Sequence, residues 1–219
     1  MMGPNDLLLV VDVQNDFCPG GNLPVADGDQ VVPVINRLLP QFRNVILTQD
    51  WHPAHHASFA SMHAGKSPYD TISMPYGEQT LWPDHCIQGS KGAAFHPDLE
   101  TDSALAVIRK GMNASIDSYS AFTENDRSTP TGLGGLLGAL HIQRVFLVGL
   151  AFDFCVGWSA TDARAHGFEA IVIEDATRPV NLPGTVDAAK DAFRDAGVAV
   201  TVSREVEGAG AGGKGRPTR

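Results

Sequence analysis

The chain is poor in cysteine and in positive charge, and it has no long apolar run. Three cysteines in 219 residues are too few for a disulfide framework and cannot all pair, which favours a reducing compartment. Sixteen Lys and Arg against 25 Asp and Glu give a net charge of −9, so the positive surface that binds nucleic acid is missing. No apolar stretch approaches the roughly 20 residues that cross a bilayer. The run at 7–11 is cut short by Asp12 and is too acidic for a signal peptide. We therefore expect a cytoplasmic protein with no nucleic-acid and no membrane partner.

What the chain does have is a regular alternation of apolar runs and helical patterns. The strand-like runs are 7–13, 45–48, 106–108, 145–150, 170–173 and 198–202, and the helical patterns are 30–42, 133–140, 155–166 and 186–196. This alternation predicts an α/β fold: a three-layer, doubly wound, mainly parallel sheet of about six strands with helices on both faces. The length suits a single domain over 1–206. Residues 27–29 (DGD) are expected to cap the first helix.

Two segments depart from this alternation. Residues 51–99 show little periodicity but hold six of the eight histidines, at 52, 55, 56, 63, 85 and 96. A long irregular segment within a domain is usually functional or disordered, and its aromatic and histidine content favours an ordered, functional segment. The glycine-rich residues 207–219 predict a disordered tail.

Three reactive side chains follow predicted strands. Asp12 comes after the first strand, Lys110 after the third, and Cys155 after the fourth, where it opens a predicted helix. Taken singly, each has an ordinary interpretation as a loop-capping carboxylate, a solvated ammonium or a small buried thiol. Parallel strands bring their carboxyl ends to one edge, where ligands bind. A thiol at a helix start feels the dipole, which lowers its pKa, and a neighbouring ammonium and carboxylate can stabilise thiolate and shuttle a proton. The combination favours a cysteine nucleophile.

A candidate metal site follows the second strand. Asp50 and His52 are two residues apart in an extended segment, so both point to one side, and His85 in a proline-stiffened loop is our choice of third ligand. One carboxylate and two imidazoles leave open positions, which suits zinc or ferrous iron. His55 and His56 compete for a fourth position.

The other two cysteines have weaker claims to function. Cys18 lies in a turn-rich loop and is expected to be structural. Cys86 directly follows His85 and stays open as a metal ligand.

Six short motifs occur in one order along the chain. They are residues 12–17 (DVQNDF), 49–53 (QDWHP), 82–86 (WPDHC), 110–111 (KG), 117–122 (DSYSAF) and 149–156 (GLAFDFCV). From about residue 5 to residue 203 the chain resembles the nicotinamidases of the isochorismatase-like cysteine hydrolase superfamily. The resemblance implies an amidohydrolase that converts nicotinamide to nicotinate and ammonia through a cysteine thioester and also accepts pyrazinamide-like analogues.

The resemblance also implies roles for particular residues. Cys155, Asp12 and Lys110 correspond to the family's catalytic triad. The backbone amides of Ala151 and Cys155 correspond to its oxyanion hole, beside a cis peptide bond between Leu150 and Ala151. Asp50, His52 and His85 correspond to the ligands of one divalent ion, zinc or iron, with manganese as a third candidate. Phe17, Trp82 and Tyr119 correspond to aromatic walls around a pyridine ring.

Some points stay open at this stage. Phe152 stands where many family members have a small hydroxyl residue, so the pocket can differ there. His55, His56 and Ser58 stay unassigned as a fourth ligand, and a homo-oligomer is an open alternative to a monomer. Cleavage of another amide or of the vinyl ether of isochorismate is the alternative within the superfamily. A non-catalytic binding protein on the same fold is the alternative outside it.

Overall fold

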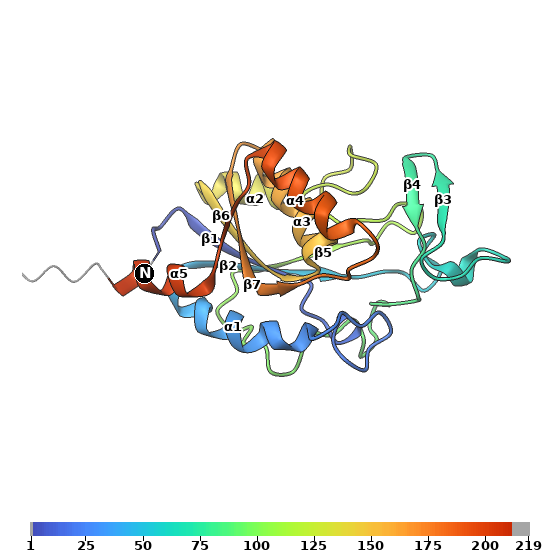
Figure 1. The fold of residues 1–219 in the computed structure, drawn as a ribbon, viewed down its shortest axis with the longest axis horizontal. Helices are drawn as coiled ribbons and strands as arrows, with labels where there is room; N and C mark the ends of the chain where they lie inside the picture. Colours follow the sequence, from blue (N-terminus) through green and yellow to red (C-terminus); the bar gives the residue numbers. More distant parts are fainter. Residues whose placement is uncertain (1, 212–219) are drawn as a thin grey trace, which may run out of the picture.

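A six-stranded parallel sheet runs through the centre of the computed structural model, which describes residues 2–211 (Figure 1). Its strands are β1 (Asp6–Val11), β2 (Asn44–Asp50), β5 (Ala106–Lys110), β6 (Arg144–Leu150), β7 (Glu169–Arg178) and β8 (Ala199–Thr201). They lie in the order β5-β2-β1-β6-β7-β8, and every neighbouring pair is parallel. The central strand β1 is buried along its whole length, as its continuous apolar run predicts.

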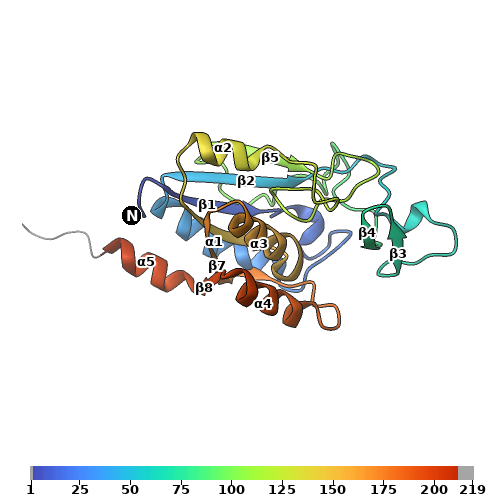
Figure 2. The ribbon, with the colours of Figure 1, turned by 90° about the horizontal axis from the view of Figure 1, so that it is seen from above.

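Helices cover both faces of this sheet. On one face lie α1 (Val31–Leu38) and α5 (Ser203–Ala211), and on the other lie α2 (Leu133–Ala139), α3 (Gly157–Ala165) and α4 (Thr185–Ala196) (Figures 1 and 2). The chain runs from β1 through β2 to β5 on one side of the sheet and then returns to place β6 on the other side of β1. With the right-handed crossovers usual between parallel strands, this reversal puts helices on both faces. The predicted three-layer α/β architecture is confirmed.

The first helix is shorter than its sequence pattern. It ends at Leu38 and passes into a 3₁₀ turn, Leu39–Gln41, since Pro40 has no N–H to continue the α-helical ladder. The expected cap at 27–29 is wrong. Another 3₁₀ turn, Gly28–Gln30, leads directly into α1, and no side chain caps that helix.

The irregular segment contains a small antiparallel hairpin that the sequence did not predict. β3 (Thr71–Met74) pairs with β4 (Gly77–Thr80), and the hairpin projects from the end of the molecule at which the sheet strands finish (Figure 1). Its strands are only four residues each. β3 alternates polar and apolar residues over this short stretch, but β4 has no apolar residue, so the sequence pattern is too short and too incomplete to predict a hairpin. Single 3₁₀ turns lie at Asn15–Phe17 and Ala60–Met62.

The C-terminal segment is partly described. α5 includes residues 207–211 of the expected tail, and residues 212–219 lie outside the described part of the chain. Among the described residues, no helix has the length and apolarity needed to cross a membrane.

Candidate active site

The structure brings Asp12, Lys110 and Cys155 together at the carboxyl end of the sheet. The Lys110 ammonium nitrogen lies 2.8 Å from Oδ2 of Asp12 and donates to Sγ of Cys155 at 3.5 Å. Neither the Lys110 nor the Asp12 side chain is accessible to solvent. Lys110 is held in place by a further hydrogen bond to the carbonyl oxygen of Ser118, at 2.8 Å.

Both carboxylate oxygens of Asp12 have close partners. The Thr48 hydroxyl on β2 donates to Oδ1 of Asp12 at 2.6 Å, and the Asp12 amide donates to the same hydroxyl oxygen at 3.1 Å. Asp12 has a positive φ of 47°, a conformation that aspartate tolerates better than most side chains. Oδ2 of Asp12 forms an ion pair with the Lys110 ammonium at 2.8 Å. The Asp12 carboxylate also lies within side-chain hydrogen-bonding reach of the Cys155 thiol.

Burial and charge set the protonation of these groups. Burial alone would lower the pKa of Lys110, but Asp12 and Asp50 raise it well above its ordinary value, so Lys110 stays an ammonium. Burial raises the pKa of Asp12, with Lys110 acting in the opposite direction. Burial also raises the pKa of the Cys155 thiol well above its usual range, although Lys110 works to lower it. The lowered thiol pKa expected from the sequence is therefore wrong, and a nearby base must remove its proton.

Cys155 lies in a π-helical turn. This turn, Phe152–Val156, precedes α3, and the amide of Val156 donates to the carbonyl oxygen of Ala151 at 3.0 Å. The sequence predicted that Cys155 itself starts the helix, whereas the helical backbone begins three residues earlier. The peptide bond between Leu150 and Ala151 is cis, as the resemblance implied.

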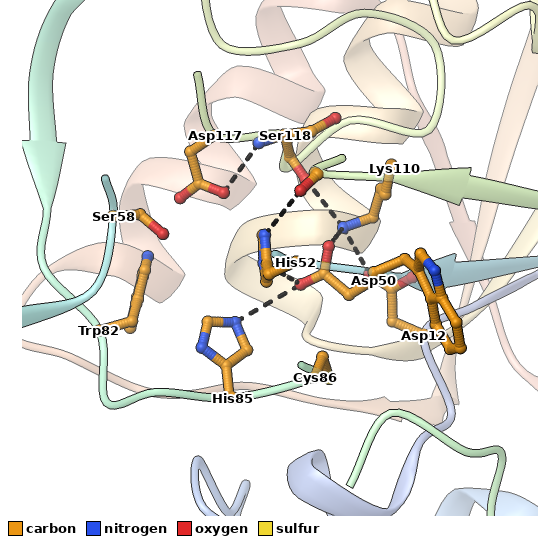
Figure 3. Close-up of polar contacts among 12 residues, drawn as sticks. Asp12, Asp50, His52, Ser58, Trp82, His85, Cys86, Lys110, Asp117 and Ser118 are labelled. Carbon is orange, nitrogen blue, oxygen red and sulfur yellow. Dashed lines mark hydrogen bonds and ion pairs between the residues drawn. The ribbon is translucent and has the colours of Figure 1, made fainter. Parts of the chain in front are cut away.

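Asp50, His52 and His85 converge on one point (Figure 3). Oδ2 of Asp50 lies 3.1 Å from Nε2 of His52 and 3.5 Å from Nε2 of His85, and all three residues are buried. The Nδ1 atoms of His52 and His85 face the carbonyl oxygens of Gly111 and Pro83, at 3.0 and 2.8 Å. A carbonyl oxygen can only accept, so each Nδ1 donates its proton to a carbonyl and each Nε2 is directed at the Asp50 carboxylate. This is the donor set and the orientation that a divalent metal requires.

The glycine after Lys110 makes room for this site. Gly111 has a φ of +66°, and a Cβ atom built on it would lie 2.4 Å from Cε1 of His52. The KG motif therefore combines a buried ammonium with a residue that lets the His52 ring approach the backbone.

The three candidates for a fourth metal ligand differ in burial. His55 is exposed, while His56 and Ser58 are buried and paired, with Nδ1 of His56 2.7 Å from the Ser58 hydroxyl. His52, His56 and Asp117 form a second group of metal-ligating atoms that lie close to one another. Cys86 is fully buried but belongs to neither group.

One pocket connects the metal-ligating residues with the thiol. Its lining includes Phe17, Trp82 and Tyr119 as well as Asp50, His85, Ala151 and Cys155. The rings of Trp82 and Tyr119 meet edge to face, with centroids 6.1 Å apart. The three aromatic residues singled out in the sequence thus surround the residues proposed for chemistry.

Other residues of the site were not found from the sequence. Leu23, Asp117, Phe154 and Val180 also line the pocket, and Thr48 orients Asp12. The parallel pairing of β1 with β2 places Val10 opposite Leu47. Thr48 and Asp12 follow these two residues, so this register could have suggested that Thr48 contacts Asp12. Phe152 is not among the lining residues. Its ring is buried against Phe193, with centroids 5.4 Å apart.

The fold, with a buried thiol, carboxylate and ammonium beside a metal-ligating cluster, defines a class of protein. The isochorismatase domain family matches residues 6–205, and the chain belongs to this family. Within it, the chain is 50% identical over 202 residues to the nicotinamidase of Acinetobacter baylyi, covering 92% of this chain and 94% of that protein.

Solved structures of related proteins are similar to this chain over most of its length. An Acinetobacter baumanii nicotinamidase and pyrazinamidase superimposes with a TM-score of 0.93 at 51% identity, covering 94% of this chain and all of that one. An L. infantum protein in complex with nicotinate gives 0.81 at 40% identity, over 93% and 96% of the two chains. The Pyrococcus horikoshii pyrazinamidase in complex with zinc gives 0.74 at 32% identity, over 91% and 99%.

Proposed function

We propose that this protein hydrolyses nicotinamide to nicotinate and ammonia through a thioester on Cys155. The observation that carries the proposal is a single aromatic pocket that reaches both the thiol and the Asp50, His52 and His85 cluster. Similarity to nicotinamidases over nine-tenths of the chain supports it. A flat ring between Trp82 and Phe17 would present its carboxamide to Cys155.

The residues present fit a divalent metal ion. One carboxylate and two imidazoles, each with its outer nitrogen held by a carbonyl, would hold zinc or iron, and manganese is a third candidate. The zinc complex of a pyrazinamidase relative supports this choice. The ion would supply a positive centre that could bind the ring nitrogen of the substrate.

The chain's own residues carry the covalent steps. The Asp12 carboxylate takes the proton of the Cys155 thiol as the sulfur attacks the carboxamide carbon. The amides of Ala151 and Cys155 receive the oxyanion, a contribution of about 3–4 kcal/mol per donor in comparable sites. Asp12 then returns the proton to the departing nitrogen, which leaves as ammonia.

The second half of the reaction reuses Asp12. Its carboxylate removes a proton from water, and the hydroxide oxygen attacks the thioester carbon. The C–S bond breaks, the sulfur regains a proton, and nicotinate is released. Throughout, the Lys110 ammonium offsets the negative charge that moves between sulfur and carboxylate.

An ammonia-release assay tests the proposal. Wild-type protein is incubated with nicotinamide, with pyrazinamide and with benzamide, each with and without a chelator. We expect ammonia from the first two substrates, loss of that ammonia with chelator, and little from benzamide, which has the carboxamide but no ring nitrogen. The absence of ammonia from nicotinamide with metal present would contradict the proposed activity.

We also propose a cytoplasmic location and a surface for self-association. The three cysteines are free thiols, which fits the reducing cytoplasm. Leu105 and Val107, at the exposed sheet edge formed by β5, offer apolar surface for a homo-oligomer. Sedimentation of the purified protein decides between monomer and oligomer.

A further inference from the structure

One buried polar side chain comes from the otherwise exposed hairpin. Gln79 lies in β4 next to Gly77 and Glu78, which are exposed, yet its own side chain is fully buried. Burying an amide is costly unless its donors and acceptor find partners. The contacts of Gln79 show that these partners lie at the wall of the substrate pocket.

The Gln79 amide makes directed contacts on both of its ends. Nε2 has three acceptors within hydrogen-bond distance for its two hydrogens: the Thr80 carbonyl oxygen at 2.7 Å, Oδ2 of Asp117 at 2.8 Å and the Tyr119 hydroxyl oxygen at 3.0 Å. Oε1 accepts from the Tyr76 hydroxyl at 3.1 Å. A carboxylate oxygen can only accept, so the nitrogen of the amide must face Asp117, which fixes the orientation of the group.

The Tyr119 hydroxyl joins two walls of the pocket. Its oxygen accepts one hydrogen bond from Gln79 and another from the indole N–H of Trp82, at 3.1 Å. The two rings are nearly perpendicular, at 80°, and both line the pocket. Hydrogen bonds from two directions fix the position of the hydroxyl oxygen, and with it the outer end of the Tyr119 ring, more closely than one bond would.

We propose that Gln79 is a positioning residue that sets the angle of Tyr119, and through its hydroxyl that of Trp82, and thereby governs affinity for the flat ring of the substrate. This inference rests on the proposed nicotinamide hydrolysis. Among the described residues, two hydrogen bonds of Gln79 reach residues that line the pocket, Asp117 and Tyr119, and none reaches Asp12, Lys110 or Cys155. Gln79 therefore affects binding of the substrate ring equally in the ground state and in the transition state. Loss of such uniform binding raises KM and leaves kcat unchanged.

The first test replaces the amide with an apolar side chain of similar length. In Gln79→Met, we expect the KM for nicotinamide to rise about tenfold, the effect of one or two lost hydrogen bonds, while kcat stays within about twofold. The matched control is Glu78→Met, the same replacement on an exposed neighbour in the same strand, which should leave both constants unchanged.

The second test asks whether Gln79 acts through the Tyr119 hydroxyl. Tyr119→Phe removes the shared acceptor, so adding Gln79→Met in that background should change KM by less than about twofold. If Gln79 only supported the fold of the hairpin, Gln79→Met would change KM by the same factor in the wild-type protein and in Tyr119→Phe.

Three results decide the matter. The inference is overturned if Gln79→Met has the KM of wild type. It is also overturned if Gln79→Met raises KM by the same factor in the presence and in the absence of the Tyr119 hydroxyl. Circular dichroism checks folding, and if Gln79→Met does not fold, Gln79→Asn, whose amide is one methylene too short to reach both partners, is judged by the same KM criteria. Failure of the wild-type protein to release ammonia from nicotinamide would instead overturn the proposed function.

Discussion

Oδ1 of Asp50 accepts a hydrogen bond from the Lys110 ammonium at 2.7 Å. The other oxygen of the same carboxylate faces His52 and His85 (Figure 3). Burial alone would raise the pKa of Asp50, but His52 and Lys110 hold it well below its usual range, so the carboxylate stays ionised. The Asp50 side chain thus joins the proposed metal site to the proposed catalytic residues. A change at Lys110 therefore also affects the metal site, and a change at the metal site also affects Lys110.

Loss of the Lys110 charge should destabilise the protein. Lys110→Met leaves Asp12 and Asp50 buried without their cation, which costs roughly 3–5 kcal/mol in comparable buried pairs. Urea unfolding should show this decrease, together with loss of ammonia release. Lys66→Met, at an exposed position, is the control and should stay within about 0.5 kcal/mol of wild type. Equal stability of the two variants would contradict the ion-pair arrangement.

Removal of one imidazole should release the metal. His85→Ala deletes a buried member of the candidate ligand set and leaves two donors, too few for tight binding. Elemental analysis of protein purified from metal-supplemented medium should show a large fall in bound zinc, iron or manganese. His55→Ala removes an exposed imidazole from the same irregular segment, residues 51–99, and should retain full metal content. Retention of metal by His85→Ala would remove this residue from the site.

The reactivity of Cys18 should depend steeply on pH. Burial and the nearby Asp29 raise the pKa of its thiol to about 11. Below that value the thiolate fraction grows about tenfold with each pH unit, so alkylation of Cys18 is slow at pH 8 and about a hundredfold faster at pH 10. The measurement uses Cys155→Ala protein, with peptide mass spectrometry to separate Cys18 from the fully buried Cys86. A rate for Cys18 that is independent of pH between 8 and 10 would contradict the raised pKa.

Phe152 should matter for stability and not for ring binding. Its ring is buried against Phe193 and does not line the pocket. Phe152→Ala leaves a cavity and should lower the free energy of unfolding by about 3–5 kcal/mol. The KM for nicotinamide, measured in the same preparation below the unfolding temperature, should stay close to wild type. A raised KM with unchanged stability would mean that Phe152 shapes the pocket after all.

The sequence predicted the sheet and the positions around its carboxyl edge because buried parallel strands leave continuous apolar runs. Asp12 and Cys155 follow such runs, and Lys110 ends the edge strand β5, whose shorter apolar run is 106–108, so their convergence could be anticipated from the sequence. The hairpin β3–β4 could not, because its exposed four-residue strands carry no such pattern.

The environment of each site residue was less predictable. The Cys155 pKa depends on burial and on three charges from distant parts of the chain, and the helix dipole alone gave the wrong sign. Gln79 and Thr48 act through hydrogen bonds to residues about 40 positions away, and a single sequence gives no measure of such contacts.

The central claim is that the Cys155 sulfur attacks the carboxamide carbon. The most direct test compares ammonia release from nicotinamide by wild type, Cys155→Ala and Cys18→Ala proteins of equal metal content. The account predicts a loss of at least about a thousandfold in kcat for Cys155→Ala and near wild-type rates for Cys18→Ala. Full ammonia release by Cys155→Ala would contradict the thioester mechanism.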